Sequence, residues 1–342
     1  MAGRIFVHKE ITVSSFAAVG GKEEKAGPLG AYLDYHEESG KFGAKTWELA
    51  EGEMGGLALQ FALAKEKRNP KDVSLVFAGD LQNQCVATTH GLLPFSIPYL
   101  GIYGACSTCT EGLLLSALAL SNPSVVRCAA LTSSHFCAAE RQFRLPLEYG
   151  GQRAPTAQWT ATAAGAFLLC RYEDSPHPVR LTLSASMAGR AVDGGLSDAS
   201  NMGAAMAPAA ADSILTFLSE TDTSPEEYDA IVTGDLGSEG TRLLHQILAD
   251  NGVSLGERHR DCGMLLYDKD KQDIHAGASG CGCSAAVLAA YFLPALSSGK
   301  LRKILFLSTG ALMSPSSIEQ GEDIVGIAPV ICLQSGKENH FV

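Results

Sequence analysis

The fold is decided by the stretch Pro70-Lys-Asp-Val-Ser-Leu-Val-Phe-Ala-Gly-Asp80-Leu81, because its pattern occurs a second time later in the chain. It aligns without gaps on Pro225-Glu-Glu-Tyr-Asp-Ala-Ile-Val-Thr-Gly-Asp235-Leu236, at an offset of 155 residues. Residues 104–133 likewise align on residues 280–309, at an offset of 176. Internal repetition of this kind predicts two copies of one structural plan that share a core.

The pattern of apolar residues around these repeats predicts alternating helices and strands. Helices are expected near residues 45–67, 108–120, 202–218, 239–251 and 284–296. Strands are expected at residues 73–78, 125–131, 165–170, 230–233, 264–267, 304–307 and 324–333. Most of these strands are continuously apolar, which is typical of strands buried on both faces. We therefore predict an α/β fold of two pseudo-symmetric halves, residues 1–175 and 176–342, packed around buried helices with a ligand pocket between them.

Composition and charge narrow the class of protein. The 342 residues are 46% hydrophobic and carry a net charge of -11, which argues against a disordered chain and against a nucleic-acid partner. The ten Cys are spread along the chain, and no signal peptide begins at Met1, so a reducing, cytoplasmic compartment is expected. The Cys spacing does not match a zinc site, so no metal and no cofactor are expected. Residues 278–296 are uncharged, but their Gly and Ser content and Pro294 favour a buried core helix over a membrane span.

Cys106 is the strongest chemical signal in the sequence. It lies in Gly101-Ile-Tyr-Gly-Ala-Cys106-Ser-Thr-Cys-Thr-Glu-Gly112, where a glycine-containing turn leads into an apolar helix. A thiol at a helix N-terminus is expected to have a lowered pKa and to act as a nucleophile. The alternative is that Cys106 is a small residue chosen for packing, as we expect for Cys109.

The Ala-Cys106-Ser turn, the duplicated halves and the glycine-rich loop at residues 275–285 resemble the thiolase and ketoacyl-synthase superfamily. In that superfamily the nucleophilic Cys lies at the buried helix of the first half. The resemblance implies that His275 is the partner of Cys106, although His275 could also be an ordinary loop histidine. It further implies an oxyanion hole built from the backbone N–H groups of Cys106 and Gly310, which could hold a ligand carboxylate instead.

A narrower resemblance covers residues 42–51, 78–84 and 133–159, which are similar to the stage V sporulation protein AD family of spore-forming bacteria. That family has a thiolase-like fold and is implicated in binding dipicolinic acid, with or without calcium, for uptake into the forespore. Two departures from the enzymatic pattern favour binding over catalysis. Gly234-Asp235-Leu236 stands where Cys-His-Asn condensing enzymes place a His, and Ser308-Thr309 stands where thiolases place a second Cys. The site is therefore expected to be degenerate.

Residues 135–153 supply basic and aromatic side chains that could recognise a flat dicarboxylate. Arg141 and Arg144 are expected to contact the ligand, since a guanidinium pairs with a carboxylate through two hydrogen bonds. His135 belongs to the same expected set, and Arg153 follows in the same segment. The alternative for each Arg is an ion pair with Glu140 or Glu148 in a structural or dimer-interface loop.

Asp80 and Asp235 end the two repeated strands at equivalent positions. Each could cap the helix that follows, or each could face the pocket. Capping is favoured for Asp235, and the two roles have equal weight for Asp80. A pocket carboxylate could coordinate calcium or accept a hydrogen bond from a protonated pyridine ring.

We therefore expect a protein that binds dipicolinic acid or its calcium chelate near Cys106. It would act as the soluble recognition component of an uptake system, peripheral on the cytoplasmic side of the spore inner membrane. Other spore membrane uptake proteins would hold it there, because the sequence contains no basic amphipathic helix. The superfamily also implies a homodimer, formed through the strand that follows the nucleophile helix. The alternatives are an acyltransferase that uses Cys106 as its acyl acceptor and a structural scaffold without a ligand.

Overall fold

The computed structural model describes residues 4–143, 153–176 and 180–336. Its strands are β1 (Ile5–Val7), β2 (Ile11–Gly21), β3 (Tyr35–Glu37), β4 (Leu75–Gly79), β5 (Tyr99–Gly101), β6 (Arg127–Ser134), β7 (Trp159–Thr160), β8 (Ala163–Arg171), β9 (Arg180–Met187), β10 (Val192–Asp193), β11 (Ala230–Thr233), β12 (His259–Asp261), β13 (Ala278–Ser279), β14 (Lys303–Leu307), β15 (Gly310–Leu312), β16 (Val325–Ile327) and β17 (Val330–Gly336). Its helices are α1 (Lys22–Ala26), α2 (Trp47–Lys65), α3 (Val86–Leu92), α4 (Thr108–Ala119), α5 (Phe136–Phe143), α6 (Met202–Thr221), α7 (Gly237–Asp250), α8 (Cys262–Leu265), α9 (Cys281–Val287), α10 (Leu293–Ser297) and α11 (Pro315–Glu319).

The main sheet has the same plan when followed from either end. Its order is β12-β11-β14-β17-β9-β2-β8-β6-β4-β5, with β1 beside β9 and β3 beside β2. From one end, β5, β4 and β6 run parallel, and β8 and β2 then alternate in direction. From the other end, β12, β11 and β14 run parallel, and β17 and β9 then alternate. This confirms the predicted duplicated α/β fold. The predicted division after residue 175 falls in the connection between β8 and β9, and it stays a prediction about domain organisation.

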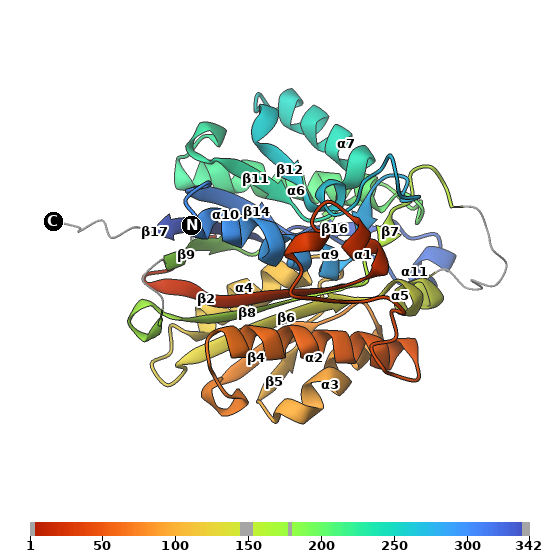
Figure 1. The fold of residues 1–342 in the computed structure, drawn as a ribbon. Coiled ribbons are helices and arrows are strands. Elements are labelled where there is room, and N and C mark those ends of the chain that lie inside the picture. Colours follow the sequence, from red (N-terminus) through yellow and green to blue (C-terminus); the bar gives the residue numbers. More distant parts are fainter. Residues whose placement is uncertain (1–3, 144–152, 177–179, 337–342) are drawn as a thin grey trace.

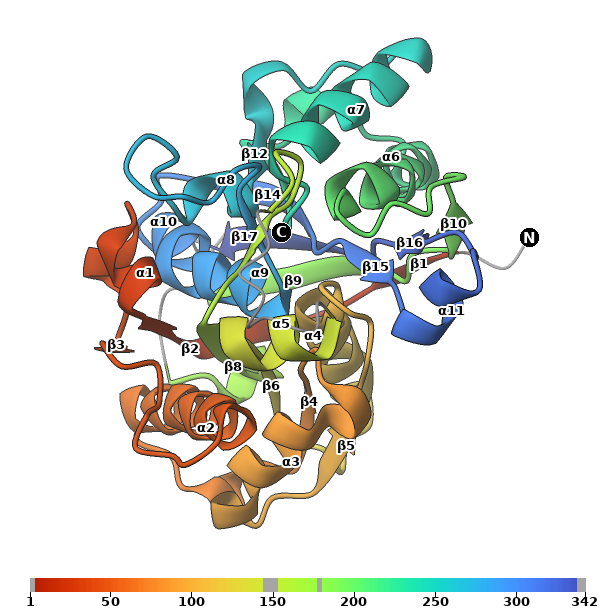
Figure 2. The ribbon, with the colours of Figure 1, turned by 90° about the vertical axis from the view of Figure 1, so that its right-hand side faces the viewer.

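The two halves are stacked as layers (Figure 1). Helices α2 and α3 lie on the outer side of the first half, and α6 and α7 lie on the outer side of the second. Helices α4, α9 and α10 lie between the two halves of the sheet, as Figure 2 shows from a second direction. Residues of α4 and α9 pack in one core cluster with strand residues of both halves. The helices that follow the two glycine-rich turns are thus the shared centre of the fold.

The uncharged segment at residues 278–296 is buried inside the protein. It forms α9, a π-helical turn at Leu288–Phe292, and α10, and nearly all of its side chains are buried. Within the described part of the chain, α6 is the one helix long and apolar enough to cross a membrane by length and composition. About two thirds of the apolar part of α6 is buried inside the protein. This burial is typical of a core helix.

Three expectations from the sequence are wrong in detail. Residues 264–267 do not form a strand, because Asp261 caps this stretch by accepting a hydrogen bond from the backbone of Met264, and the short helix α8 forms there. Residues 324–333 divide into β16 and β17, which belong to different sheets. The strand after α4, which is β6, pairs with β4 on one side and β8 on the other. It therefore has no free edge at which a second copy of the chain could pair.

The sequence also failed to reveal the two strands at the centre of the sheet, β2 and β9. Strand β2 contains Ser14 and Ser15, which hide its apolar pattern. Both hydroxyl groups are buried and bonded, Ser14 to Glu66 at 2.8 Å and Ser15 to the carbonyl of Ala62 at 2.7 Å. Polar residues are stable inside a sheet when their hydrogen bonds are satisfied in this way.

Candidate functional site

Cys106 occupies a tight, buried turn between β5 and α4. The residue before it, Ala105, has a positive φ of 50°, and Cys106 itself is 4% exposed. A Cβ at Gly104 would lie 1.7 Å from Oε1 of Glu111, so a larger residue there would displace that side chain. Helix α4 begins two residues after Cys106, at Thr108. The predicted placement of a thiol just before a buried helix is therefore confirmed.

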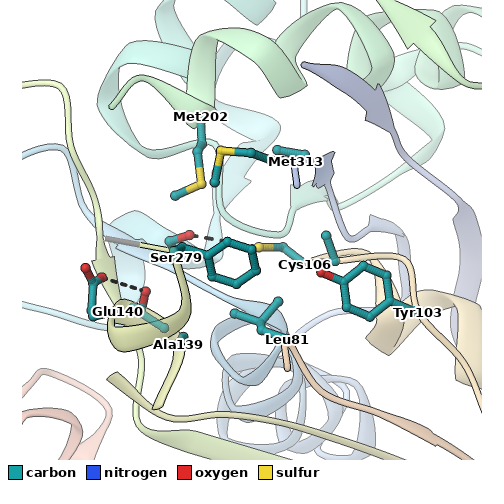
Figure 3. A pocket seen from close by; sticks show the side chains of 12 residues that line it. Leu81, Tyr103, Cys106, Ala139, Glu140, Met202, Ser279 and Met313 are labelled. Atoms are coloured by element: carbon teal, nitrogen blue, oxygen red, sulfur yellow. Dashed lines mark hydrogen bonds between the residues drawn. The ribbon is translucent and has the colours of Figure 1, made fainter. Parts of the chain in front are cut away.

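The second half of the chain brings a hydroxyl and a carboxyl group to this thiol. Sγ of Cys106 lies 3.9 Å from Oγ of Ser279 (Figure 3). Ser279 donates a hydrogen bond of 3.3 Å to Oδ2 of Asp235, which also accepts one of 2.9 Å from the backbone N–H of Gly280. Thr309 donates to Oδ1 of Asp235 at 2.9 Å. Asp235 does not cap α7, contrary to the role that the sequence favoured.

The electrostatic environment keeps this thiol protonated. Burial raises the pKa of Cys106 well above its ordinary value, and the negative charge of the neighbouring Asp235 raises it further. Burial also raises the pKa of Asp235 to about 7, although hydrogen bonds from Cys106 and Thr309 oppose the shift. The lowered thiol pKa expected from the helix N-terminus is thus wrong, because desolvation and a nearby carboxylate outweigh the helix dipole. A neutral thiol is a poor nucleophile and a weak hydrogen-bond donor.

A small, mainly apolar cavity opens beside Cys106. Its volume is about 40 Å³, room for about three water molecules. Among the residues that line it, none carries a basic side chain, and Glu140 carries the one carboxyl group. Burial raises the pKa of Tyr103, so its hydroxyl stays protonated. The lining consists of Leu81, Tyr103, Ala105, Cys106, Ala139, Glu140, Phe143, Thr160, Met202, Ser279, Ala311 and Met313.

Gly310, expected in the oxyanion hole, packs against the Cys106 turn. A Cβ at Gly310 would lie 2.3 Å from the carbonyl oxygen of Gly104 and 3.1 Å from Oγ of Ser107. Only glycine fits this approach between β15 and the turn. The structure therefore brings together three of the predicted residues: Cys106, Asp235 and Gly310.

Asp80 is buried and makes hydrogen bonds within its own half. Its Oδ1 accepts from the backbone N–H of Gln82, and its Oδ2 accepts from both the backbone and the hydroxyl of Thr88, all within 2.8 Å. It thus holds the turn after β4 and the first turn of α3. Within the described part of the chain, no group of three or more His, Cys, Asp or Glu side chains is placed to hold a metal ion.

His275 lies apart from Cys106, on an open cavity that it shares with Arg153, Ala154 and Pro155. Its Nδ1 is 2.8 Å from the carbonyl of Ala154, and its Nε2 is 3.1 Å from Oδ1 of Asp273. Arg153 stacks over the ring of Trp159 at 4.8 Å and pairs with Asp273 at 3.2 Å. His275 is not among the residues that line the cavity at Cys106, so the structure does not bring it to the thiol.

The remaining predicted residues lie elsewhere. His135 contacts the carbonyl of Gly40 through Nε2 at 2.8 Å and lines a different cavity. Arg141 pairs with Glu48 of α2 at the surface. Arg144 lies outside the described residues. Arg141 therefore forms an ion pair, as in the alternative, but its partner is Glu48 and neither Glu140 nor Glu148.

Sequence reasoning missed several residues that line the cavity. Ser279 lies in the glycine-rich loop that the sequence singled out, and its hydroxyl was a signal that could have been used. Met202 and Met313 come from α6 and from the residue after β15, and no motif marks either of them. Their positions depend on how the two halves pack, which local sequence patterns do not encode.

Comparisons with known proteins agree with this geometry. Solved structures of a 3-oxoacyl-(acyl-carrier-protein) synthase III from Aquifex aeolicus VF5 and of an OleA variant from Xanthomonas campestris have similar folds. The synthase has a TM-score of 0.58 at 12% identity, over 95% of this chain and 99% of that one. The OleA variant has a TM-score of 0.59 at 13% identity, over 95% and 99%. The fold is therefore thiolase-like, as the sequence predicted.

One curated relative is much more similar in sequence. "Stage V sporulation protein AD" from Bacillus subtilis (strain 168) is 39% identical over 324 residues, which cover 95% of this chain and 94% of the relative. The family model of stage V sporulation protein AD matches residues 3–334. The chain belongs to the stage V sporulation protein AD family.

Proposed function

We propose that this protein binds dipicolinic acid, with or without calcium, and serves as the recognition component of its uptake into the forespore. The observation that carries the proposal is that the thiol of Cys106 is protonated. The nucleophile position of the thiolase-like fold holds a protonated thiol beside Asp235, where condensing enzymes have a His. A protonated thiol without an imidazole base beside it supports reversible binding better than condensation.

The cavity beside Cys106 suits one end of a flat aromatic ligand. The rings of Tyr103 and Phe143 line it and offer faces for stacking. The Tyr103 hydroxyl and the Cys106 thiol, both protonated, can donate hydrogen bonds to a carboxylate. The present volume is too small for a pyridine dicarboxylate, so Met202 and Met313 must move aside, which their unbranched side chains allow.

The charge of the ligand must be balanced from elsewhere. The described lining has no basic side chain, and Glu140 adds an acidic one. Calcium bound to dipicolinate would cancel the two carboxylate charges, and Arg144, the residue after Phe143 in sequence, could also contribute. For this reason the ligand must be tested in both its free and its chelated form.

Isothermal titration calorimetry with dipicolinate tests the proposal, once with a chelator present and once with excess calcium. Benzene-1,3-dicarboxylate is the matched control ligand, because it keeps both carboxylates but lacks the pyridine nitrogen. We expect saturable binding of at least one dipicolinate form, with weaker binding of the control. No heat and no thermal shift with either form at millimolar concentration would contradict the proposal.

The alternative is an acyltransferase that loads Cys106. The series of contacts from Cys106 to Ser279 to Asp235 gives this alternative a structural basis. Asp235, with a pKa of about 7, could accept the thiol proton of Cys106 through the hydroxyl of Ser279. Incubation with a set of acyl-CoA thioesters followed by intact mass measurement separates the two functions. An acyl adduct that is lost in Cys106→Ala supports the enzyme, and no adduct supports the binding protein.

Assembly and location belong to the same proposal. We place the protein at the cytoplasmic side of the spore inner membrane through other uptake proteins, and we propose a homodimer. In place of β6, the candidate for pairing between two copies is the outer edge of β5, the last strand of the sheet among the described residues, with Leu100 52% and Tyr103 45% exposed nearby. Analytical ultracentrifugation of Leu100→Lys tests this, since a charge at the pairing edge should shift a dimer toward monomer.

A further inference from the structure

A second cavity, separate from that at Cys106, contains both tryptophans of the chain. Its volume is about 160 Å³, and it lies between the start of α1, the loop before α2 and the start of α5. Trp47, His135, Phe136 and Trp159 form its aromatic part, and we call it the tryptophan cavity. It shares no lining residue with the cavity at Cys106.

The aromatic faces of this cavity are arranged in two groups. Phe136 and Trp159 are stacked, with ring centroids 3.9 Å apart. Trp47 lies against His135, with centroids 5.3 Å apart. The ammonium group of Lys41 already sits over the Trp47 ring, 3.2 Å from its centroid. The Trp47 face therefore accepts a cation in this structure.

His135 supplies an unsatisfied hydrogen-bond acceptor. The residue is 2% exposed, and its Nε2 contacts the carbonyl of Gly40 at 2.8 Å, so Nε2 must be the protonated nitrogen. Burial lowers the pKa of His135, which keeps the ring neutral and leaves Nδ1 with a free lone pair. Nδ1 is buried and has no hydrogen-bond partner. A buried acceptor without a donor is costly, and a ligand that supplies an N–H would remove this cost.

With Lys41 over the Trp47 ring, charged groups of both signs surround the cavity. Glu23, Glu24 and Glu38 line it, against one basic lining residue, Lys22. Burial raises the pKa of Glu24, which accepts hydrogen bonds from the backbone of Gly21 and Thr162. Glu23 and Glu38 thus remain as the carboxylates that can balance a positive ligand.

We propose that the tryptophan cavity binds a primary alkylammonium group. Its N–H donates to Nδ1 of His135, its charge lies over the Trp47 face, and Glu23 and Glu38 balance that charge. The ligand replaces Lys41, which holds the same aromatic face when the cavity is empty. The head group is common to free diamines and to lysine side chains. This site is independent of dipicolinate binding, so either function can fail without the other.

Intrinsic fluorescence reports on this cavity directly, because the chain contains two Trp and both line it. The probe is n-butylammonium chloride, with n-butanol at equal concentration as the uncharged control. We expect a saturable change in emission with the ammonium ion and none with the alcohol. His135→Phe should weaken the apparent affinity at least about tenfold through loss of the acceptor. Lys41→Met should strengthen it, because the internal competitor is removed.

Matched variants keep the test decisive. Cys106→Ser changes the other cavity and should leave the response to butylammonium unaltered. If circular dichroism shows that His135→Phe does not fold, the test uses Glu38→Gln instead. This variant should weaken butylammonium binding several-fold. The proposal is overturned by an unchanged emission up to 100 mM ammonium, by an equal response to butanol, or by full affinity in the folded variant. Titrations with 1,5-diaminopentane and with acetyl-lysine methylamide then identify the source, since the tighter of the two is the natural class.

Discussion

The sequence Gly-Asp-Leu stands at the ends of both β4 and β11, yet the two aspartates make different hydrogen bonds. Asp80 binds the backbone of its own turn and of α3. In the second half Asp261, and not Asp235, binds the backbone of the turn, because it accepts hydrogen bonds from the backbone of Leu236 and Gly237. Asp235 is thereby free to reach Ser279 and the thiol of Cys106. Both halves therefore have a turn capped by an aspartate, but only in the second half does the Asp of Gly-Asp-Leu face Cys106.

The largest effect is expected when the capping residue of either half is removed. Asp261→Ala leaves three backbone N–H groups and the Thr233 hydroxyl without their acceptor. It should lower the free energy of unfolding by about 3 kcal/mol, and Asp80→Ala should lower it by about 2 kcal/mol. Urea unfolding measures both, with the exposed Asp270→Ala as control. Equal stability of Asp261→Ala and this control would show that Asp261 does not cap the turn after β11.

The pH dependence of stability tests the protonation of Asp235 next. The folded state holds a proton on Asp235 up to a pKa of about 7, whereas the unfolded chain releases it near its ordinary value of 3.8. The stabilisation from this group is therefore complete below pH 4 and is lost as the pH rises toward 7. Between pH 5 and 7.5 the loss should amount to about 2.5 kcal/mol. Asp235→Asn should flatten this slope, and a slope equal to that of the unaltered protein would contradict the assignment.

Thiol reactivity gives a smaller but more local test. Asp235→Asn removes a negative charge beside Cys106, so the pKa of the thiol should fall and its alkylation by iodoacetamide should accelerate about tenfold. Asp80→Asn should change the rate much less, because Asp80 does not contact the thiol. Peptide mass mapping assigns the modified cysteine. Equal rates in both variants would mean that the second-half aspartate has no special relation to Cys106.

The smallest effect is expected at Arg141. Its ion pair with Glu48 is partly exposed, so Arg141→Ala should change the free energy of unfolding by less than about 1 kcal/mol. Dipicolinate affinity should stay the same, since Arg141 does not line the cavity at Cys106. A marked loss of binding in the calorimeter would move the ligand site toward α5.

The sequence predicted the architecture well because the repeat is carried by local features. Apolar runs, glycine-rich turns and the Gly-Asp-Leu strand ends depend on neighbours in the chain, and they located α2, α4, α6 and α7. The central strand β2 was missed because buried serines with hydrogen-bond partners from α2 look like loop residues in the sequence. Tertiary contacts here override local propensity.

The site was predicted less well, for a physical reason. Cys106, Asp235 and Gly310 come together because each follows a strand of the duplicated plan, β5, β11 and β14. His135, His275 and Arg141 have suitable chemistry, but they lie on segments that approach other surfaces. The direction of the Cys106 pKa shift was also wrong, because burial and Asp235 depend on the packing of the second half against the first.

Dipicolinate affinity in Asp235→Asn and Asp80→Asn tests the central claim most directly. Calorimetry at pH 8 with a chelator present keeps Asp235 ionised and excludes calcium. If the ligand binds beside Cys106, loss of the Asp235 charge should tighten binding of the dianion about tenfold, whereas Asp80→Asn should leave it within about twofold. Equal effects of the two substitutions, or an effect of Asp80→Asn alone, would contradict the assignment of the ligand site to the Cys106 cavity.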